Sequence, residues 1–94
     1  WELPGGKLEP RESLKQCLKR EIKEELDIQI AKIKKIGLIK HQYSHMKLTI
    51  TLFKCIHHSG TAKPLASQEV RWITMKEKKS FAFPRATHKL FELL

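Results

Sequence analysis

The spacing of apolar residues predicts a helix in the first third of the chain. Its apolar positions recur at intervals of three and four residues: Leu14, Cys17, Leu18, Ile22 and Leu26. This period places them on one face of a helix that runs from about Leu14 to Leu26. Ser13, followed by Gln16, forms a capping box that predicts where the helix begins. Residues 1–12 contain two prolines and two glycines and are predicted to form a loop.

From Ile28 onward the apolar residues follow the pattern of extended strands. We expect one strand over residues 28–38, bent or bulged at Gly37, and a second over residues 46–52 with one buried face. The two are predicted to form an antiparallel hairpin, followed by a turn at residues 58–61 that includes His58, with His57 beside it. Residues 70–75 predict a further strand, and Pro84 opens a C-terminal helix over residues 85–94. This order predicts an α+β domain with a helix on each side of a sheet.

Length and charge narrow the class of protein. The chain has 94 residues, which predicts a single domain over residues 1–94. Its net charge is +9, with a balance of −1 over residues 1–27 and +10 over residues 28–94. The asymmetry favours a phosphate-bearing partner, either nucleic acid or a nucleotide, and the alternative is a basic surface that only confers solubility. No apolar run is long enough to cross a bilayer. Cys17 and Cys55 are the only cysteines and lack CxxC spacing, which favours a reducing, cytoplasmic setting over a disulfide scaffold.

Acidic residues lie on the helical face that should be buried. Glu21 and Glu25 fall within about 20° of Leu14 around the helix axis, and Glu24 lies at the edge of the apolar stripe. Carboxylates one turn apart repel each other and lose hydration when they are buried. A hard cation such as Mg²⁺ or Mn²⁺ would compensate, because both prefer oxygen ligands. The alternative is that these glutamates pair with neighbouring Lys and Arg residues on a solvated face.

The segment from Gly6 to Ile28, GKLEPRESLKQCLKREIKEELDI, resembles the signature of Nudix hydrolases, G-x5-E-x7-R-E-U-x-E-E-x-G-U, where U is bulky and aliphatic. The one departure is Asp27, where the family has a glycine that caps the helix in a left-handed conformation. Asp tolerates that conformation better than most residues do.

The resemblance implies a fold, a chemistry and a set of residues. It implies an α/β/α sandwich with a mixed sheet, whose first strand would precede Trp1 and is missing from this sequence. It implies hydrolysis of a nucleoside diphosphate linked to another group, with Mg²⁺ or Mn²⁺ as cofactor. The implied catalytic and metal-binding residues are Arg20, Glu21, Glu24 and Glu25, with the Gly5 carbonyl as a further ligand. Arg20 would orient the glutamates, Lys7 would contact phosphates, and Glu12 would support the loop.

Within the superfamily two groups share the form of the segment WELPGGKLEP. One consists of MutT-type pyrophosphohydrolases, which act on oxidised dGTP. The other is the C-terminal domain of A/G-specific adenine DNA glycosylase, which recognises 8-oxoguanine in duplex DNA. The segment Tyr43-Ser44-His45 resembles the base-recognition loop of the glycosylase domain, and the alternative for it is an ordinary turn. Thr87 stands where MutT-type enzymes have an Asn that reads the purine, so it is a further candidate for base recognition.

The interpretation favoured by sequence is therefore the glycosylase domain, with a retained metal site. The alternative is a stand-alone 8-oxo-dGTP diphosphatase. The expected partner is 8-oxoguanine-containing duplex DNA in the first case and an oxidised purine nucleotide in the second. Glu69 is a candidate late acid of the Nudix site, and its alternative is a solvated residue at a strand end.

Overall fold

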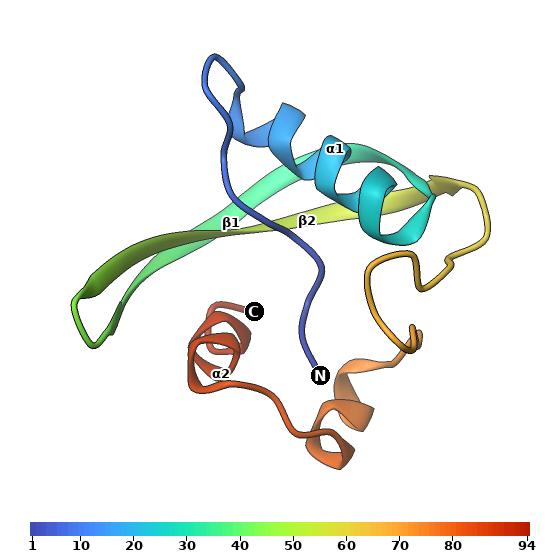
Figure 1. Cartoon of the computed structure of the whole chain (residues 1–94). Helices are drawn as coiled ribbons and strands as arrows, with labels where there is room; N and C mark the ends of the chain where they lie inside the picture. The colour runs from blue at the N-terminus through green and yellow to red at the C-terminus, as the bar shows by residue number, and fades with distance from the viewer.

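A computed structural model describes residues 1–94. It contains helix α1 (Leu14–Leu26), strands β1 (Gln29–Tyr43) and β2 (Met46–Ser59), a 3₁₀ helix η1 (Met75–Ser80) and helix α2 (Arg85–Phe91). The two strands form a long twisted ribbon, and α1 and α2 lie on opposite sides of it (Figure 1). The predicted α+β architecture with a helix on each side of the sheet is confirmed. No helix is long and apolar enough to cross a membrane.

Helix α1 begins and ends where local signals predict. The Ser13 side chain accepts a hydrogen bond from the Gln16 backbone, and the Gln16 side chain accepts one from the Ser13 backbone, which completes the capping box. At the other end Asp27 has a φ of 56° and a ψ of 38°, and its N–H donates to the Lys23 carbonyl. Asp27 therefore adopts the left-handed cap that was predicted for the position of the family glycine.

The hairpin is antiparallel, and Tyr43 pairs with Met46 across a turn of two residues. A register shift between Lys35 and Gly37 confirms the predicted bulge, and a second shift lies between Ala31 and Lys34. These bulges let a long ribbon bend and twist, so that its two faces can pack against different helices.

Several expectations about the second half of the chain are wrong. Residues 70–75 do not form a strand, and the only sheet is the antiparallel pair rather than a mixed sheet. Thr74 instead caps η1 in a capping box with Glu77, which ends the extended run. His57 and His58 belong to β2 rather than to a turn, because the strand continues to Ser59 opposite Gln29. Helix α2 ends at Phe91, three residues before the predicted end.

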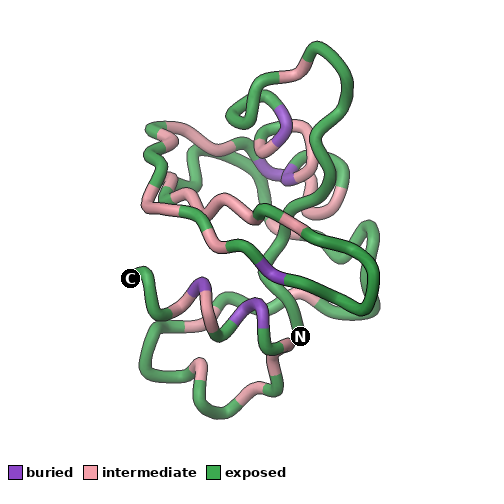
Figure 2. The backbone as a smooth tube through the Cα atoms, turned by 90° about the vertical axis from the view of Figure 1, so that its left-hand side faces the viewer, coloured by how far each residue is buried: buried purple, intermediate pink, exposed green.

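The core is small and lies on both faces of the ribbon. The buried apolar residues form two groups. The first consists of Cys17, Ile22 and Ile28, and the second consists of Ala86 and Leu90 in α2 (Figure 2). Burying an aliphatic side chain the size of Ile22 contributes roughly 1.5–3 kcal/mol. The first group therefore fixes α1 against the ribbon, and α1 carries the candidate site.

Gly60 offers a direct test of how the end of β2 meets the end of α1. Its φ is +92°, and a Cβ built there would lie 2.8 Å from the Asp27 carbonyl oxygen. We expect Gly60→Ala to lower the free energy of unfolding by about 2 kcal/mol through backbone strain and this clash. The matched control is Gly37→Ala, whose Cβ would make an ordinary 3.4 Å contact with Leu93. Urea unfolding monitored by circular dichroism measures both, and equal losses would contradict the expectation.

Candidate active site

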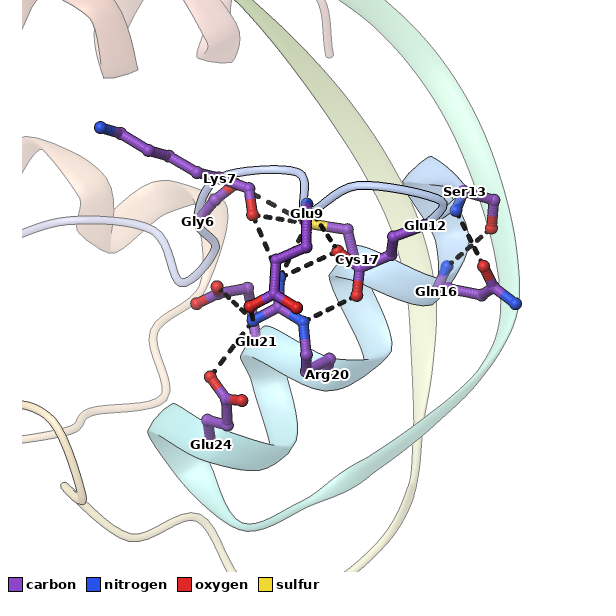
Figure 3. Close-up of polar contacts among 10 residues, drawn as sticks. All are labelled: Gly6, Lys7, Glu9, Glu12, Ser13, Gln16, Cys17, Arg20, Glu21 and Glu24. Atoms are coloured by element: carbon purple, nitrogen blue, oxygen red, sulfur yellow. Dashed lines mark hydrogen bonds and ion pairs between the residues drawn. The ribbon is translucent and has the colours of Figure 1, made fainter.

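The N-terminal loop lies along α1, and Arg20 joins the two (Figure 3). Its Nε donates to Glu12 Oε2 at 2.7 Å and its Nη2 donates to Glu12 Oε1 at 2.9 Å, which makes a bidentate pair. The same Nη2 donates to the Lys7 carbonyl at 3.1 Å. Because a guanidinium presents its donors in a fixed fork, these bonds set both the distance and the angle between loop and helix.

Glu12 supports the loop, as the resemblance implies. Besides the two bonds from Arg20, its Oε1 accepts a hydrogen bond from the Glu9 backbone N–H at 3.0 Å. Hydrogen bonds from Arg20 and Glu9 lower the pKa of Glu12 from 4.5 to about 2. In turn, hydrogen bonds to Glu12 and Glu21 raise the pKa of Arg20. Both groups are therefore charged at neutral pH.

Glu21 and Glu24 contact the remaining arm of Arg20. Its Nη1 donates to Glu21 Oε1 at 2.7 Å and to Glu24 Oε2 at 3.3 Å. The Glu21 carboxylate also lies directly against Gly6, so that a Cβ built on Gly6 would overlap it. Any larger residue at this position would have to displace the Glu21 carboxylate, which Arg20 holds.

Glu25 lies at the far end of this acidic group and contacts the other glycine. Its Oε1 accepts a hydrogen bond from the Gly5 N–H at 3.1 Å, and Gly5 has a φ of +152°, which favours glycine. Partial burial is the largest cause that raises the pKa of Glu25, and the neighbouring Glu21 and Glu24 raise it further. The charged form of Glu25 is thus disfavoured in the structure, as expected where a cation would relieve carboxylate repulsion.

The donor set fits a hard divalent cation. Glu21, Glu24 and Glu25 each have one carboxylate oxygen that makes a hydrogen bond and a second oxygen without a hydrogen-bond donor. Oxygen donors of this kind are what Mg²⁺ and Mn²⁺ prefer. In the described geometry, however, no three His, Cys, Asp or Glu side chains converge closely enough to hold a metal ion. The metal-ligand assignment therefore stays a prediction.

Cys17 was not expected to take part in the loop–helix contact. Its Sγ donates to the Lys7 carbonyl at 3.5 Å and to the Gly6 carbonyl at 3.8 Å. Burial raises its pKa, which keeps the thiol protonated. The position of Cys17 on the apolar stripe, one turn before Glu21, is the signal that could have predicted this contact.

The Lys7 side chain points away from α1 and is free to contact a ligand (Figure 3).

The predicted base-recognition residues lie away from this acidic group, and Glu69 makes no hydrogen bond or ion pair with it. The hairpin tip with Tyr43, Ser44 and His45 extends away from α1 and toward α2 (Figure 1). Thr87 is in α2 and only 6% exposed. Glu69 is exposed and accepts a hydrogen bond from Arg71 at 2.9 Å. The structure thus brings together Gly5, Lys7 and the four α1 residues, and it leaves the base-recognition candidates apart from them. Glu69 forms its ion pair with Arg71 and not with this group.

Comparison with known proteins identifies the family of this chain. The family model described as NUDIX domain matches residues 1–93. The chain belongs to the Nudix family. An 8-oxo-dGTP diphosphatase of Buchnera aphidicola from Acyrthosiphon pisum is 29% identical over 94 residues, which cover 100% of this chain and 76% of the relative. Its counterpart from Schizaphis graminum is 33% identical over 84 residues, 89% of this chain and 63% of the relative. A CTP pyrophosphohydrolase of Escherichia coli is 28% identical over 92 residues, 98% of this chain and 68% of the relative.

These relatives bear on the two functions that the sequence left open. All three are named as hydrolases of nucleoside triphosphates, and the Nudix domain here spans 63% to 76% of their lengths. They support the alternative interpretation, a MutT-type hydrolase. They give no support to the glycosylase domain that sequence alone favoured, nor to duplex DNA as partner. The segment Tyr43-Ser44-His45 and the net charge of +9 were among the features that favoured the glycosylase domain, and both are weak signals beside relatives matched over 84 to 94 residues.

The Arg20–Glu12 pair predicts how stability depends on pH. Because the pKa of Glu12 is lowered to about 2, the pair contributes stability above pH 4.5 that is lost as the pH falls toward 2. We expect Glu12→Gln to destabilise the domain at pH 7. Because the variant lacks the titrating carboxyl, it should lose less stability than wild type as the pH falls. The raised pKa of Glu25 favours the folded state at low pH, which is the opposite effect, but Glu25 is present in both wild type and variant, so the difference between them is unaffected.

Thermal unfolding of wild type and variant between pH 7 and pH 2 measures this difference. The control is Glu9→Gln, because Glu9 is exposed and lies 3.6 Å from Arg20. If Glu12→Gln unfolds with the wild-type pH dependence, the pair does not stabilise the fold in the way described.

Proposed function

We propose that the chain is the catalytic domain of a divalent-metal-dependent nucleoside triphosphate pyrophosphohydrolase. Its proposed substrate is an oxidised purine nucleotide such as 8-oxo-dGTP, by similarity to relatives of that name. The observation that carries the proposal is the glycine loop hydrogen-bonded onto the carboxylates of α1. It combines oxygen donors with a backbone that can approach a ligand closely.

Nudix hydrolases generally need a divalent metal, and the proposed ligands in this chain are Glu21, Glu24 and Glu25, with the Gly5 carbonyl. A bound Mg²⁺ or Mn²⁺ neutralises phosphate charge and lowers the pKa of an attacking water. Arg20 holds Glu21 and Glu24 on one side, so that their second oxygens remain free on the other. We assign Lys7 to the substrate phosphates, because its side chain extends from the loop that carries Gly5 and Gly6.

The selection of the base is a separate assignment. Tyr43, Ser44, His45 and Thr87 stay the predicted base-recognition residues, and Glu69 stays the predicted late acid. Thr87 offers one hydroxyl in place of the carboxamide of Asn, which can form two hydrogen bonds to a base. Recognition of the purine by this residue is therefore weaker. Relative rates with 8-oxo-dGTP, dGTP and CTP would show how strongly the domain selects among bases.

The first test measures pyrophosphate release from 8-oxo-dGTP with Mg²⁺. We expect turnover that EDTA abolishes and that falls by about 100-fold in Glu24→Gln, because this change removes a proposed metal ligand. The matched control, Glu92→Gln, makes the same chemical change on an exposed residue at the end of α2 and should keep wild-type turnover. A folded chain that releases no pyrophosphate from any of the three nucleotides would refute the proposal.

Arg20→Lys tests whether the guanidinium positions the glutamates. Lysine keeps the charge but cannot bond Glu12 in a bidentate way while it also contacts Glu21. We expect turnover to fall roughly 10- to 100-fold, with a higher Mg²⁺ concentration needed for half-maximal rate. The Mg²⁺ titration separates this role from a purely structural one, since partial unfolding would lower the rate at every Mg²⁺ concentration equally. An unchanged Mg²⁺ dependence would therefore contradict the positioning role.

A further inference from the structure

The β1–β2 hairpin carries positive charge that the rest of the molecule does not neutralise. Between Ile28 and Gln68 the chain has seven lysines and no Asp or Glu. Six of these lysines lie in the hairpin: Lys32, Lys34, Lys35, Lys40, Lys47 and Lys54. None of the six forms an ion pair in the structure. Their charge is therefore available to an external anion.

Two of these lysines face each other across the strands. Lys34 is the direct partner of Lys54 in the antiparallel register, so both side chains project from the same face. Like charges directly opposite in a sheet are unfavourable. An anion bound between them would turn this repulsion into attraction.

A hollow of about 340 Å³ lies at this pair. It is lined by three lysines and three less polar residues: Lys32, Lys34, Lys54, Ile36, Cys55 and Ile56. Lys32 reaches it from the bulge with a φ of 51°, a left-handed conformation that is uncommon for residues other than glycine. Ile56 is 51% exposed, so the hollow combines cationic and apolar surface.

We propose that this lysine-lined hollow binds single-stranded nucleic acid. Its lysines would contact phosphates, and Ile36 and Ile56 would contact bases. A single strand fits better than a duplex, because bases in a duplex are stacked inside and cannot reach apolar groups beside the phosphate contacts. This binding goes beyond the proposed hydrolase, since the hollow includes none of the α1 carboxylates.

The test is fluorescence anisotropy of a labelled oligothymidine of about 20 nucleotides, titrated with the full chain between roughly 50 and 200 mM salt. We expect binding that weakens with salt. Lys34→Gln/Lys54→Gln should reduce the slope of log K against log salt by about 1.4, that is about 0.7 for each lost phosphate contact. This double variant removes a like-charge pair, so it should unfold at no lower temperature than wild type.

The matched control is Lys76→Gln/Lys79→Gln, which removes the same charge from η1. It should keep the wild-type slope. The proposal is overturned if the chain does not bind oligothymidine at the lowest salt concentration. It is also overturned if the two double variants reduce the slope of log K against log salt by the same amount. It is also overturned if a duplex of equal length binds as tightly, or if polyglutamate competes as well as unlabelled oligothymidine. Either of the last two results would identify a non-selective polyanion surface.

Discussion

The position of the N-terminal loop depends on one guanidinium group. Arg20 reaches Glu12 and the Lys7 carbonyl in the loop, and it reaches Glu21 and Glu24 on its own helix. A lysine could not make these contacts together, because its ammonium is a point charge and not a planar fork. The loop is therefore held at the distance at which Gly6 touches Glu21 and the Gly5 N–H reaches Glu25.

Arg20 does not neutralise the site that it organises. Its single positive charge faces three carboxylates at hydrogen-bonding distance, those of Glu12, Glu21 and Glu24. Glu25 lies outside this group of contacts, and partial burial together with the neighbouring Glu21 and Glu24 raises its pKa. The arrangement thus keeps an excess of negative charge beside a backbone fixed by glycines. Such an excess favours the binding of a compensating cation, in keeping with the metal site proposed for these carboxylates.

Features that depend on neighbouring residues could be predicted from the sequence, and features that depend on distant ones could not. The capping box at Ser13, the cap at Asp27 and the bulge near Gly37 follow from local chemistry. A strand requires a partner, so the β-prone residues 70–75 gave a false prediction when the local cap at Thr74 started η1 instead. The Nudix spacing selected Glu12 and Arg20, but only the fold shows that they form a bidentate pair. For the same reason the separation of the hairpin tip from α1 could not be read from the sequence.

The distribution of charge links the acidic helix to the basic hairpin. The carboxylates of α1 take their cation from Arg20 on the same helix, so the hairpin lysines remain without partners. A polyphosphate approaching α1 alone would meet repulsion from the carboxylates, whereas the lysines attract it over a Debye length of about 8 Å at physiological salt. Opposite charges are thus kept apart on one small domain, with the carboxylates on α1 held by Arg20 and the unpaired lysines on the hairpin. In the proposed hydrolase, the positive field of the hairpin would attract an anionic substrate that the carboxylates alone would repel. Pairing the lysines with the glutamates would have removed the positive field of the hairpin and occupied the carboxylates that are the proposed metal ligands.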